Sequence, residues 1–192
     1  MFTKVDSYEI ELSSDCNAAC PLCTRTDLNM PLRGNDNITL DDFKNIFYDT
    51  DMIAGVEFLF SGVLGDPILN PDCYQICEFL TTNGGKVILN TNGGYGTVKF
   101  WTKMAGLKRM TVNFAVDGGP DTNHLYRKNV KWATLLRNMK AFSAADGSGS
   151  CVFIEFDHNY QDFEFVENLA KELDFTFRSR INRDKSWRAD VP

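Results

Sequence analysis

Short strand-like segments alternate with helix-like segments along nearly the whole chain, and this order limits the fold more than any other feature of the sequence. Alternating or short apolar runs typical of strands fill 8–13, 56–60, 86–89, 110–116, 151–156 and 175–177, the last with room to continue to residue 181. Apolar residues at helical spacing fill 40–52, 71–80, 98–105, 130–145 and 163–173. Thr39, followed by Asp41 and Asp42, is a suitable N-cap for the first of these helices. The sequence therefore predicts six β–α steps, the last helix missing or short, and an α/β fold with parallel strands.

Two architectures fit this order. One is a partial (βα)6 TIM-like barrel, open on one side, and the other is an open doubly wound sheet; periodicity does not separate them. In both, active sites collect at the carboxyl ends of the parallel strands. The loops at those ends also hold the most unusual residues of the sequence, so we expect any site there. They are residues 14–38, 61–70, 90–96, 117–129 and 157–161.

The composition excludes several classes of protein. With 20 Lys+Arg against 26 Asp+Glu, the chain carries a formal charge of −6, which argues against electrostatic binding to nucleic acid or to an anionic membrane. No apolar run reaches the ~18 residues of a membrane span, and the N-terminus lacks the apolar stretch of a signal peptide. We therefore expect a single cytoplasmic domain over residues 1–192, in a reducing compartment where structural disulfides are rare.

Three of the six cysteines, Cys16, Cys20 and Cys23, fall in one polar loop directly after the first strand, in the pattern C-x3-C-x2-C. Three thiolates on a short loop suit a soft metal or an iron–sulfur cluster. Structural zinc sites and simple iron–sulfur carriers normally use four protein ligands. Three ligands on a four-iron cluster leave one iron free to bind a substrate or a cofactor. The alternative is a zinc ion held by these cysteines and by His124 or His158, the only two histidines.

The other three cysteines, Cys73, Cys77 and Cys151, lie in a predicted helix and a predicted strand, and we expect them to be packing residues. The chain has no G-x-S-x-G motif, so the sequence gives no sign of a hydrolase nucleophile elbow. The cysteine loop is therefore the feature that most clearly carries chemistry.

The segment CNAACPLCTR after a first strand resembles the signature of the radical S-adenosylmethionine (radical SAM) superfamily. Later segments resemble motifs of the same family, in the same order: FSGVLGDPILNPD its "GGEP" segment, LNTNGG its T-N-G, and NFAVDG its S-I-D-G. HLYRKNVKWATLLRNMKAF and FDHNYQ are similar to segments of members related to the SPASM subgroup. The resemblance covers roughly residues 7–182, the expected barrel, and leaves 183–192 as a tail.

The resemblance implies a partial (βα)6 barrel with two cofactors, one [4Fe–4S] cluster and S-adenosylmethionine (SAM). By match, Cys16, Cys20 and Cys23 bind the cluster, and the amino and carboxylate groups of SAM chelate the fourth iron. The reduced cluster then cleaves SAM to methionine and a 5′-deoxyadenosyl radical, which takes a hydrogen atom from the substrate. The cofactors supply this chemistry, and the protein supplies position and the exclusion of water. The resemblance assigns no catalytic side chain.

In the family, the GGEP-type segment receives the amino group of SAM. Here Gly65 is expected to let the backbone approach the ligand. Asp66 stands where Glu is usual; its side chain is one methylene shorter but still accepts from an ammonium group. Val63 and Leu64 also depart from the usual spacing. The same residues fit a plain Gly-Asp-Pro turn.

Four further positions match residues that contact SAM in the family. We expect Thr91 and Asn92 near the ribose or the methionine part, and Asp117 near the ribose hydroxyls. Arg127 is expected to pair with the SAM carboxylate, because its guanidinium offers a bidentate fork. The alternatives are two ordinary turns, at Thr91 and Asp117, and a surface arginine at a helix start.

Three more residues complete the expected cofactor site. Leu22, between the second and third cysteines, matches a position whose backbone touches adenine. His158 and Asn159, at the carboxyl end of the fifth strand, are candidates for the lining of the adenosine or substrate pocket.

The chain has no cysteine after Cys151, whereas SPASM-type relatives carry a further cysteine-rich segment with auxiliary clusters. We therefore expect a single cluster and a barrel with one side open for a macromolecular substrate or a second subunit. The C-terminal residues are basic, and form either a solvated end or a contact for an acidic substrate or partner. These basic residues are Arg178, Arg180, Arg183, Lys185 and Arg188.

The resemblance does not identify the substrate. A peptide or protein fits the SPASM-like segments, activation of a glycyl-radical enzyme fits the short chain, and a deazapurine-forming enzyme of the carboxy-deazaguanine synthase type is also compact. No motif indicates Mg²⁺. An electron donor such as flavodoxin or ferredoxin is expected, without a membrane or nucleic-acid partner. Outside this class, the alternatives are a cysteine-rich zinc-binding domain without enzymatic activity and an inactive radical SAM relic.

Overall fold

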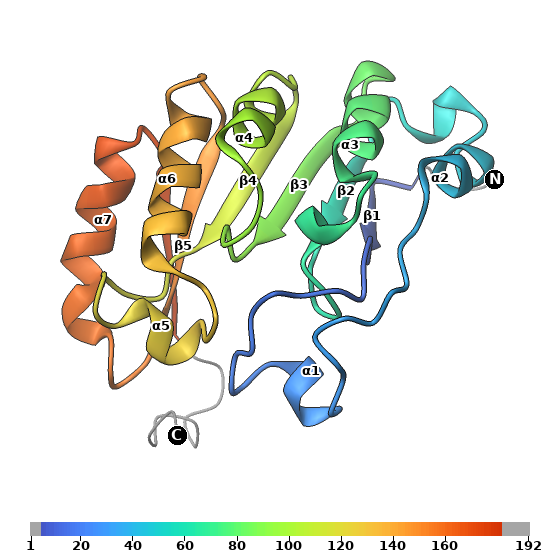
Figure 1. The fold of residues 1–192 in the computed structure, drawn as a ribbon. Helices are drawn as coiled ribbons and strands as arrows, with labels where there is room; N and C mark the ends of the chain where they lie inside the picture. The colour runs from blue at the N-terminus through green and yellow to red at the C-terminus, as the bar shows by residue number, and fades with distance from the viewer. Residues whose placement is uncertain (1–4, 182–192) are drawn as a thin grey trace.

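The computed structural model describes residues 5–181, which contain one six-stranded sheet (Figure 1). The strands lie in the order β1 to β6, and every neighbouring pair is parallel. β1 and β6 are the two edges, and they do not pair with each other within the described residues. The strands are β1 (Ser7–Ile10), β2 (Glu57–Phe60), β3 (Lys86–Thr91), β4 (Met110–Ala115), β5 (Gly149–Glu155) and β6 (Thr176–Ile181).

The main helices cover one face of this sheet (Figure 1). Alternate residues of the strands point into the layer between sheet and helices, where Phe58, Phe114 and Phe153 are fully buried. The ring of Phe114 lies 5.1 Å from that of Trp101 and 5.7 Å from that of Phe142, centroid to centroid. The covering helices are α2 (Leu40–Ile46), α3 (Cys73–Thr82), α4 (Val98–Ala105), α6 (Trp132–Ser143) and α7 (Phe163–Glu172). The short helices are α1 (Thr24–Asp27) and α5 (Asn123–Tyr126), and the 3-10 turns are η1 (Thr50–Met52), η2 (Pro67–Leu69) and η3 (Tyr160–Asp162).

The strand order decides between the two predicted architectures. A doubly wound sheet reverses its strand order at a switch point and carries helices on both faces. Here the order in the sheet follows the order in the chain, and the main helices lie on one face. The opposite face carries smaller and polar side chains, among them Asn90, Asn113 and Ala115, which line a cavity. The prediction of a partial (βα)6 barrel is confirmed.

β1 ends at Ile10, three residues before its predicted end at 13, because the next residues pair elsewhere. Ser13 forms an antiparallel bridge with Asn37, and Ile38 N donates to Leu12 O at 3.1 Å. The first and last residues of the loop after β1 therefore pair with each other and close the loop at its base.

The helix predicted at 40–52 consists of two elements. Thr39 is its N-cap, as predicted, and forms a capping box with Asp42. α2 then ends at Ile46, and the side chain of Asp49 accepts a backbone N–H two residues on, at 3.0 Å, to start η1. A side chain that caps a new turn competes with the continuation of a helix, and apolar periodicity does not reveal this competition.

The other elements lie where they were predicted, with smaller shifts of their boundaries. α4 has the predicted bounds, whereas β3 continues to Thr91 and β5 begins at Gly149 because their ladders with β4 extend that far. No helix among residues 5–181 is both long and apolar enough to cross a membrane. The tail predicted at 183–192, with Arg183, Lys185 and Arg188, lies outside the described residues. Cys73, Cys77 and Cys151 are buried in the core, as predicted.

Candidate functional site

A cavity of about 250 Å³ lies at the carboxyl ends of the strands, on the face of the sheet away from the main helices. The loops that carry α1 and α5 meet there (Figure 1), and Ala19 N donates to Lys128 O at 3.0 Å between them. The structure brings most of the predicted cofactor residues to this cavity. Those that line it are Cys16, Cys20, Cys23, Gly65, Asp66, Thr91, Asn92 and Arg127.

Arg25, two residues after the third cysteine, is the buried anchor of the cysteine loop. It is 5% exposed, and its guanidinium donates to the backbone carbonyl oxygens of Ser14, Pro31 and Leu64. These carbonyls belong to both arms of the cysteine loop and to the loop after β2. Sequence reasoning missed Arg25, because an arginine beside a motif gives no sign that its side chain folds underneath it.

Asp66 is buried where the loops after β2 and β3 meet. Its carboxylate accepts from Thr91 Oγ1 at 3.0 Å, from Asn92 N at 2.8 Å and from Ile68 N at 3.2 Å. Burial raises the pKa of Asp66 to about 6, against the lowering effect of these hydrogen bonds. At neutral pH the group is therefore mostly a carboxylate, and it fixes Thr91 and Asn92 at the wall of the cavity.

Asn92 connects the end of β3 to the cysteine loop. Its Nδ2 lies 2.9 Å from Asn17 Oδ1 and 3.8 Å from Cys16 Sγ, and its Oδ1 accepts from Gly94 N at 2.8 Å. A second donor, Ala18 N, lies 3.4 Å from the same sulfur. N–H groups aimed at a sulfur stabilise its thiolate form and tune the sulfur ligands of a metal cluster.

Gly65 lets the backbone of the loop after β2 lie directly against the backbone of the cysteine loop. A Cβ at this position would lie 2.0 Å from Ser13 O and 2.8 Å from Asp15 O. The next residue, Asp66, donates its N–H to Asp15 O at 2.7 Å. Gly65 lines the cavity and makes a close approach to the base of the cysteine loop, while its expected approach to a ligand stays a prediction.

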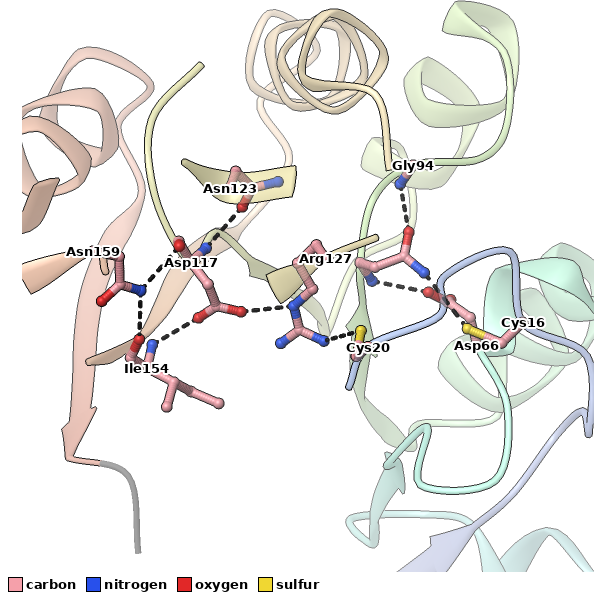
Figure 2. Close-up of polar contacts among 10 residues, drawn as sticks. Cys16, Cys20, Asp66, Gly94, Asp117, Asn123, Arg127, Ile154 and Asn159 are labelled. Atoms are coloured by element: carbon pink, nitrogen blue, oxygen red, sulfur yellow. Dashed lines mark hydrogen bonds and ion pairs between the residues drawn. The ribbon is translucent and has the colours of Figure 1, made fainter. Parts of the chain in front are cut away.

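Arg127 points from the turn after α5 towards Cys20 (Figure 2). Its Nε lies 2.6 Å from Asp117 Oδ2, and its Nη1 lies 3.6 Å from Cys20 Sγ. The side chain is 18% exposed, so the alternative of a free surface arginine does not describe it. Burial alone would lower the pKa of Arg127, but the Asp117 carboxylate raises that pKa above its usual value. The guanidinium is therefore a fixed positive charge beside a motif cysteine.

Asp117 is fully buried, and both of its carboxylate oxygens are engaged within the protein. Oδ1 accepts from Ile154 N at 2.7 Å, and Oδ2 accepts from Arg127. Its backbone N donates to Asn123 Oδ1 and its backbone O accepts from Asn159 Nδ2, each at 2.9 Å (Figure 2). Asp117 is not among the residues that line the cavity. In this structure Asp117 positions Arg127, and the ribose contact expected of it stays a prediction.

Three other predicted residues also lie away from the cavity wall. Asn159 is fully buried and holds the turn after β5 through its bond to Asp117 O. His158 stacks on Phe156, with the ring centroids 5.3 Å apart, and burial lowers its pKa. Leu22 is partly buried and packs against the core. None of these three residues lines the cavity, and their expected contacts with the adenosine part of SAM or with the substrate stay predictions.

The cavity also includes residues that sequence reasoning missed. Asn90 on β3 and Asn113 on β4 lie side by side, and Asn113 Nδ2 donates to Asn90 Oδ1 at 2.9 Å. A signal was present, because each is a polar residue inside an otherwise apolar strand. Glu11 does not line the cavity but holds the loop after β2, because its carboxylate accepts from Val63 N and Leu64 N, each at 2.9 Å. Arg180, which was expected either in a solvated end or at a contact for an acidic substrate or partner, also lines the cavity. The other missed lining residues are Ala18, Arg25, Ser61, Gly62, Ala115 and Val152.

The donor set suits an iron–sulfur cluster. Cys16, Cys20 and Cys23 line one cavity as free thiols. Burial raises the pKa of the Cys16 thiol to about 11, and it also raises the pKa of the Cys20 thiol. Both thiols are therefore protonated at neutral pH without a metal, and each releases its proton when a metal binds the thiolate. Within residues 5–181, no three His, Cys, Asp or Glu side chains gather closely enough to hold one metal ion. Three cysteine thiols at one cavity are ligands of the kind that iron–sulfur clusters use.

Sequence comparison identifies relatives of the chain. A family model described as the Radical SAM superfamily matches residues 10–171. Among curated proteins, the chain is 29% identical over 167 residues to an AdoMet-dependent heme synthase of Methanosarcina barkeri (strain Fusaro / DSM 804). The match covers 85% of this chain and 46% of that protein, so the chain spans about half the length of the curated relative.

Solved structures share the fold at low sequence identity. Streptococcus suis SuiB bound to S-adenosylmethionine superposes with a TM-score of 0.70 at 16% identity, over 96% of this chain and 42% of SuiB. The protein anSMEcpe, with bound AdoMet and a Cp18Cys peptide, superposes with a TM-score of 0.68 at 19% identity, over 90% of this chain and 50% of that one. At these identities the likeness concerns the fold, and it agrees with the partial barrel described above.

Proposed function

The chain belongs to the radical SAM superfamily, and from this premise we propose that it is an enzyme that holds a [4Fe–4S] cluster on Cys16, Cys20 and Cys23 and binds SAM beside it. Members of this superfamily use both cofactors. The observation that carries the proposal is that the three thiols share one cavity with a buried carboxylate, Asp66, and a fixed guanidinium, Arg127.

When bound, the cluster and SAM together supply a 5′-deoxyadenosyl radical, which takes a hydrogen atom from the substrate. The residues of this chain hold and shelter these groups. The thiolates of Cys16, Cys20 and Cys23 would hold the cluster, which would leave one of its irons open to SAM. Arg25 keeps the cysteine loop folded over the cavity, and N–H groups of Ala18 and Asn92 point at Cys16 Sγ. A closed, largely desolvated site protects a radical from side reactions.

The polar groups around the cavity divide the recognition of SAM between them. Arg127 offers its outer guanidinium nitrogens to the SAM carboxylate. Asp117 accepts from Nε and so fixes the orientation of the guanidinium plane. Gly65 and Asp66 form the part of the cavity wall that receives the amino group of SAM. Because its carboxylate is already hydrogen-bonded to Thr91 and Asn92, Asp66 acts partly by orienting these two neighbours. Asn159 acts indirectly, through Asp117.

The substrate is not fixed by family membership. SuiB has also been solved with its precursor peptide SuiA, anSMEcpe carries a Cp18Cys peptide, and the curated relative is a heme synthase. One fold therefore serves different substrates, and the likeness does not choose among them. We propose that the substrate, a peptide being one candidate, enters on the inner face of the sheet, whose edges β1 and β6 do not pair within the described residues.

The proposal includes a partner and a compartment. Reduction of the cluster needs one electron, for which a small donor such as flavodoxin or ferredoxin is suited. Iron–sulfur chemistry and six free cysteines fit the cytoplasm, where thiols stay reduced.

The experiment is an anaerobic assay for 5′-deoxyadenosine. The protein is reconstituted with iron and sulfide, reduced with dithionite and given SAM, and the product is quantified by chromatography. We expect product from the unmodified chain and from Cys151→Ala, a matched change at a buried core cysteine. We expect neither cluster nor product from Cys20→Ala. Product formation that survives Cys20→Ala, or a colourless protein that carries stoichiometric zinc, would refute the proposal.

A further inference from the structure

The cavity has a second wall, to which the proposed function assigns the substrate but no individual residue. The cysteine loop, Asp66 and Arg127 form the first wall. The second is the inner face of β3 to β6, which exposes Asn90, Asn113, Ala115, Val152 and Arg180 to the same space. A group placed against this wall would lie directly opposite the cofactors.

Two buried polar atoms on the inner face of the sheet, of which the first belongs to a residue that lines the cavity, have no hydrogen-bond partner among residues 5–181. They are Asn113 Oδ1 and Ser150 Oγ, from residues that are 9% and 1% exposed. The register pairs Asn113 with Ser150 on neighbouring strands, so the two side chains share the inner face. Asn113 Nδ2 is already bonded to Asn90, which leaves its oxygen as a free acceptor. A buried polar group without a partner costs about 1–3 kcal/mol, so such a pair is typical of a place where a ligand supplies the partner.

Two arginines of β6 lie on the same inner face of the sheet. The register places Arg178 opposite Val152 and Arg180 opposite Ile154, so both arginines lie on the face that Val152 presents to the cavity. Arg180 itself lines the cavity. Within the described part of the chain, neither guanidinium forms an ion pair; the three ion pairs found there are made by Arg33, Arg127 and Lys171. Arg180 is therefore a cation at the cavity that has no carboxylate partner among residues 5–181, and such a group is suited to bind an anion.

From these observations we propose that the inner face of β4 to β6 is the substrate subsite, and that it binds a substrate carboxylate through Arg180, with Arg178 beside it. The planar guanidinium matches a carboxylate with two parallel hydrogen bonds. Asn113 Oδ1 accepts an N–H or O–H of the same substrate. The inference rests on the proposed function in one respect, because it places this group opposite the site where the radical forms. Arg127 is held against Asp117 and Cys20 on the first wall, so the two arginine sites serve different carboxylates.

The test is a binding measurement on the reconstituted protein with SAM, by ligand-observed NMR. Benzoate and benzamide are the first probes, since they share a shape and differ in charge. Acetyl-Glu-amide and acetyl-Gln-amide repeat the comparison for an acidic residue of a peptide, so the two pairs separate a free acid from a peptide carboxylate. The variants are Arg180→Gln, the double variant Arg178→Gln/Arg180→Gln, and the control Arg109→Gln, an exposed arginine at the amino end of β4.

We expect the acid of at least one pair to bind at least tenfold more tightly than its amide. Arg180→Gln is expected to remove this preference and the double variant to remove it completely, while the dissociation constant for SAM stays at its original value. Arg109→Gln is expected to keep both. Because Arg180 is exposed on an edge strand, its replacement is not expected to unfold the chain.

Three results would overturn the subsite. They are equal binding of acid and amide by the unmodified protein, equal effects of Arg180→Gln and Arg109→Gln, and a loss of SAM affinity in Arg180→Gln, which would make Arg180 a cofactor residue. Tighter binding of phenyl phosphate than of benzoate would overturn the choice of a carboxylate. A failure of the proposed function would look different, because the unmodified protein would then form no 5′-deoxyadenosine while the acid preference could still be measured.

Discussion

Arg127 owes its position to a carboxylate that never reaches the cavity. Asp117 is fully buried and bonds to Arg127 Nε at 2.6 Å. In Asp117→Asn the guanidinium loses a charge-assisted bond of about 1.5–3 kcal/mol and becomes free to rotate. We expect the dissociation constant for SAM to rise about tenfold, with iron content unchanged, as measured by equilibrium dialysis and iron analysis.

Asp121→Asn is the control for this variant, because Asp121 is an exposed carboxylate in the same loop. SAM binding that is equal in Asp117→Asn and Asp121→Asn would mean that Arg127 needs no positioning. A loss of the cluster in Asp117→Asn would mean that Asp117 supports the cysteine loop instead.

Asp66 is expected to give the cofactor-free protein a characteristic dependence of stability on pH. Burial raises its pKa to about 6 in the folded chain from an ordinary value of 3.8. Between these two pH values the folded state binds a proton that the unfolded state releases, so the free energy of unfolding falls as pH rises. We expect a loss of about 3 kcal/mol across this range relative to Asp66→Asn, from denaturant melts at pH 4 to 7. A flat difference, or one that grows with pH, would contradict the buried, raised carboxyl.

Gly65 tests how closely the loop after β2 packs on the cysteine loop. A Cβ there would lie 2.0 Å from Ser13 O, a backbone atom that cannot move alone. Gly65→Ala is expected to destabilise the protein by about 3 kcal/mol, lowering Tm by about 6–12 °C. Gly106→Ala is the matched control, since its nearest atom is at 3.3 Å and its φ is −69°. Equal melting temperatures for the two variants would show that the loops are not in close contact.

At this scale the sequence identified residue types more reliably than their tasks. Cys16, Cys20 and Cys23 share a cavity because their spacing on one short loop leaves few other arrangements. Asp117 and Gly65 were found by their place in a motif, but their roles depend on which backbone approaches them from elsewhere in the chain. Arg25 was missed for the same reason, because its three carbonyl partners are 6, 11 and 39 residues away.

Among the elements, the cysteine loop depends on a single buried cation. Arg25 holds Ser14 O, Pro31 O and Leu64 O together. In Arg25→Gln these carbonyls lose their common partner, at a cost of about 3 kcal/mol. Because the loop carries the proposed cluster ligands, we expect the variant to lose iron to a chelator faster than the unmodified protein. The fall in visible absorbance measures this loss.

Arg33→Gln is the control for this loop. Arg33 lies on the same loop with a side chain that is 62% exposed, 3.7 Å from Asp15. If Arg25→Gln and Arg33→Gln lost iron at the same rate, the prediction that Arg25 anchors the cysteine loop would be wrong.

The regular elements were predictable because they depend on local patterns. α4 matches its predicted bounds, and the N-cap at Thr39 could be read from three neighbouring residues. The errors fall where a tertiary partner intervenes, as at Ser13, which leaves the sheet to pair with Asn37. They also fall where a side chain starts a competing turn, as at Asp49.

For the molecule as a whole, the decisive property is a sheet covered by its main helices on one face only (Figure 1). The apolar sides of the strands are buried beneath the helices, and the polar sides face a shared cavity. Periodicity alone predicted the number of strands but not their order, because order depends on which face the helices cover. Asn90 and Asn113 could be noticed in the sequence as polar residues, but their placement side by side at the cavity depends on the strand order and is seen only in the folded chain.

The central claim is that three cysteines hold a four-iron cluster whose remaining iron is open to SAM. The most direct test is the electron paramagnetic resonance spectrum of the reduced, reconstituted protein, recorded with and without SAM. The claim predicts one [4Fe–4S] signal per chain that changes when SAM is added, and that does not change when adenosine is added. A cluster signal that is identical with and without SAM would contradict it.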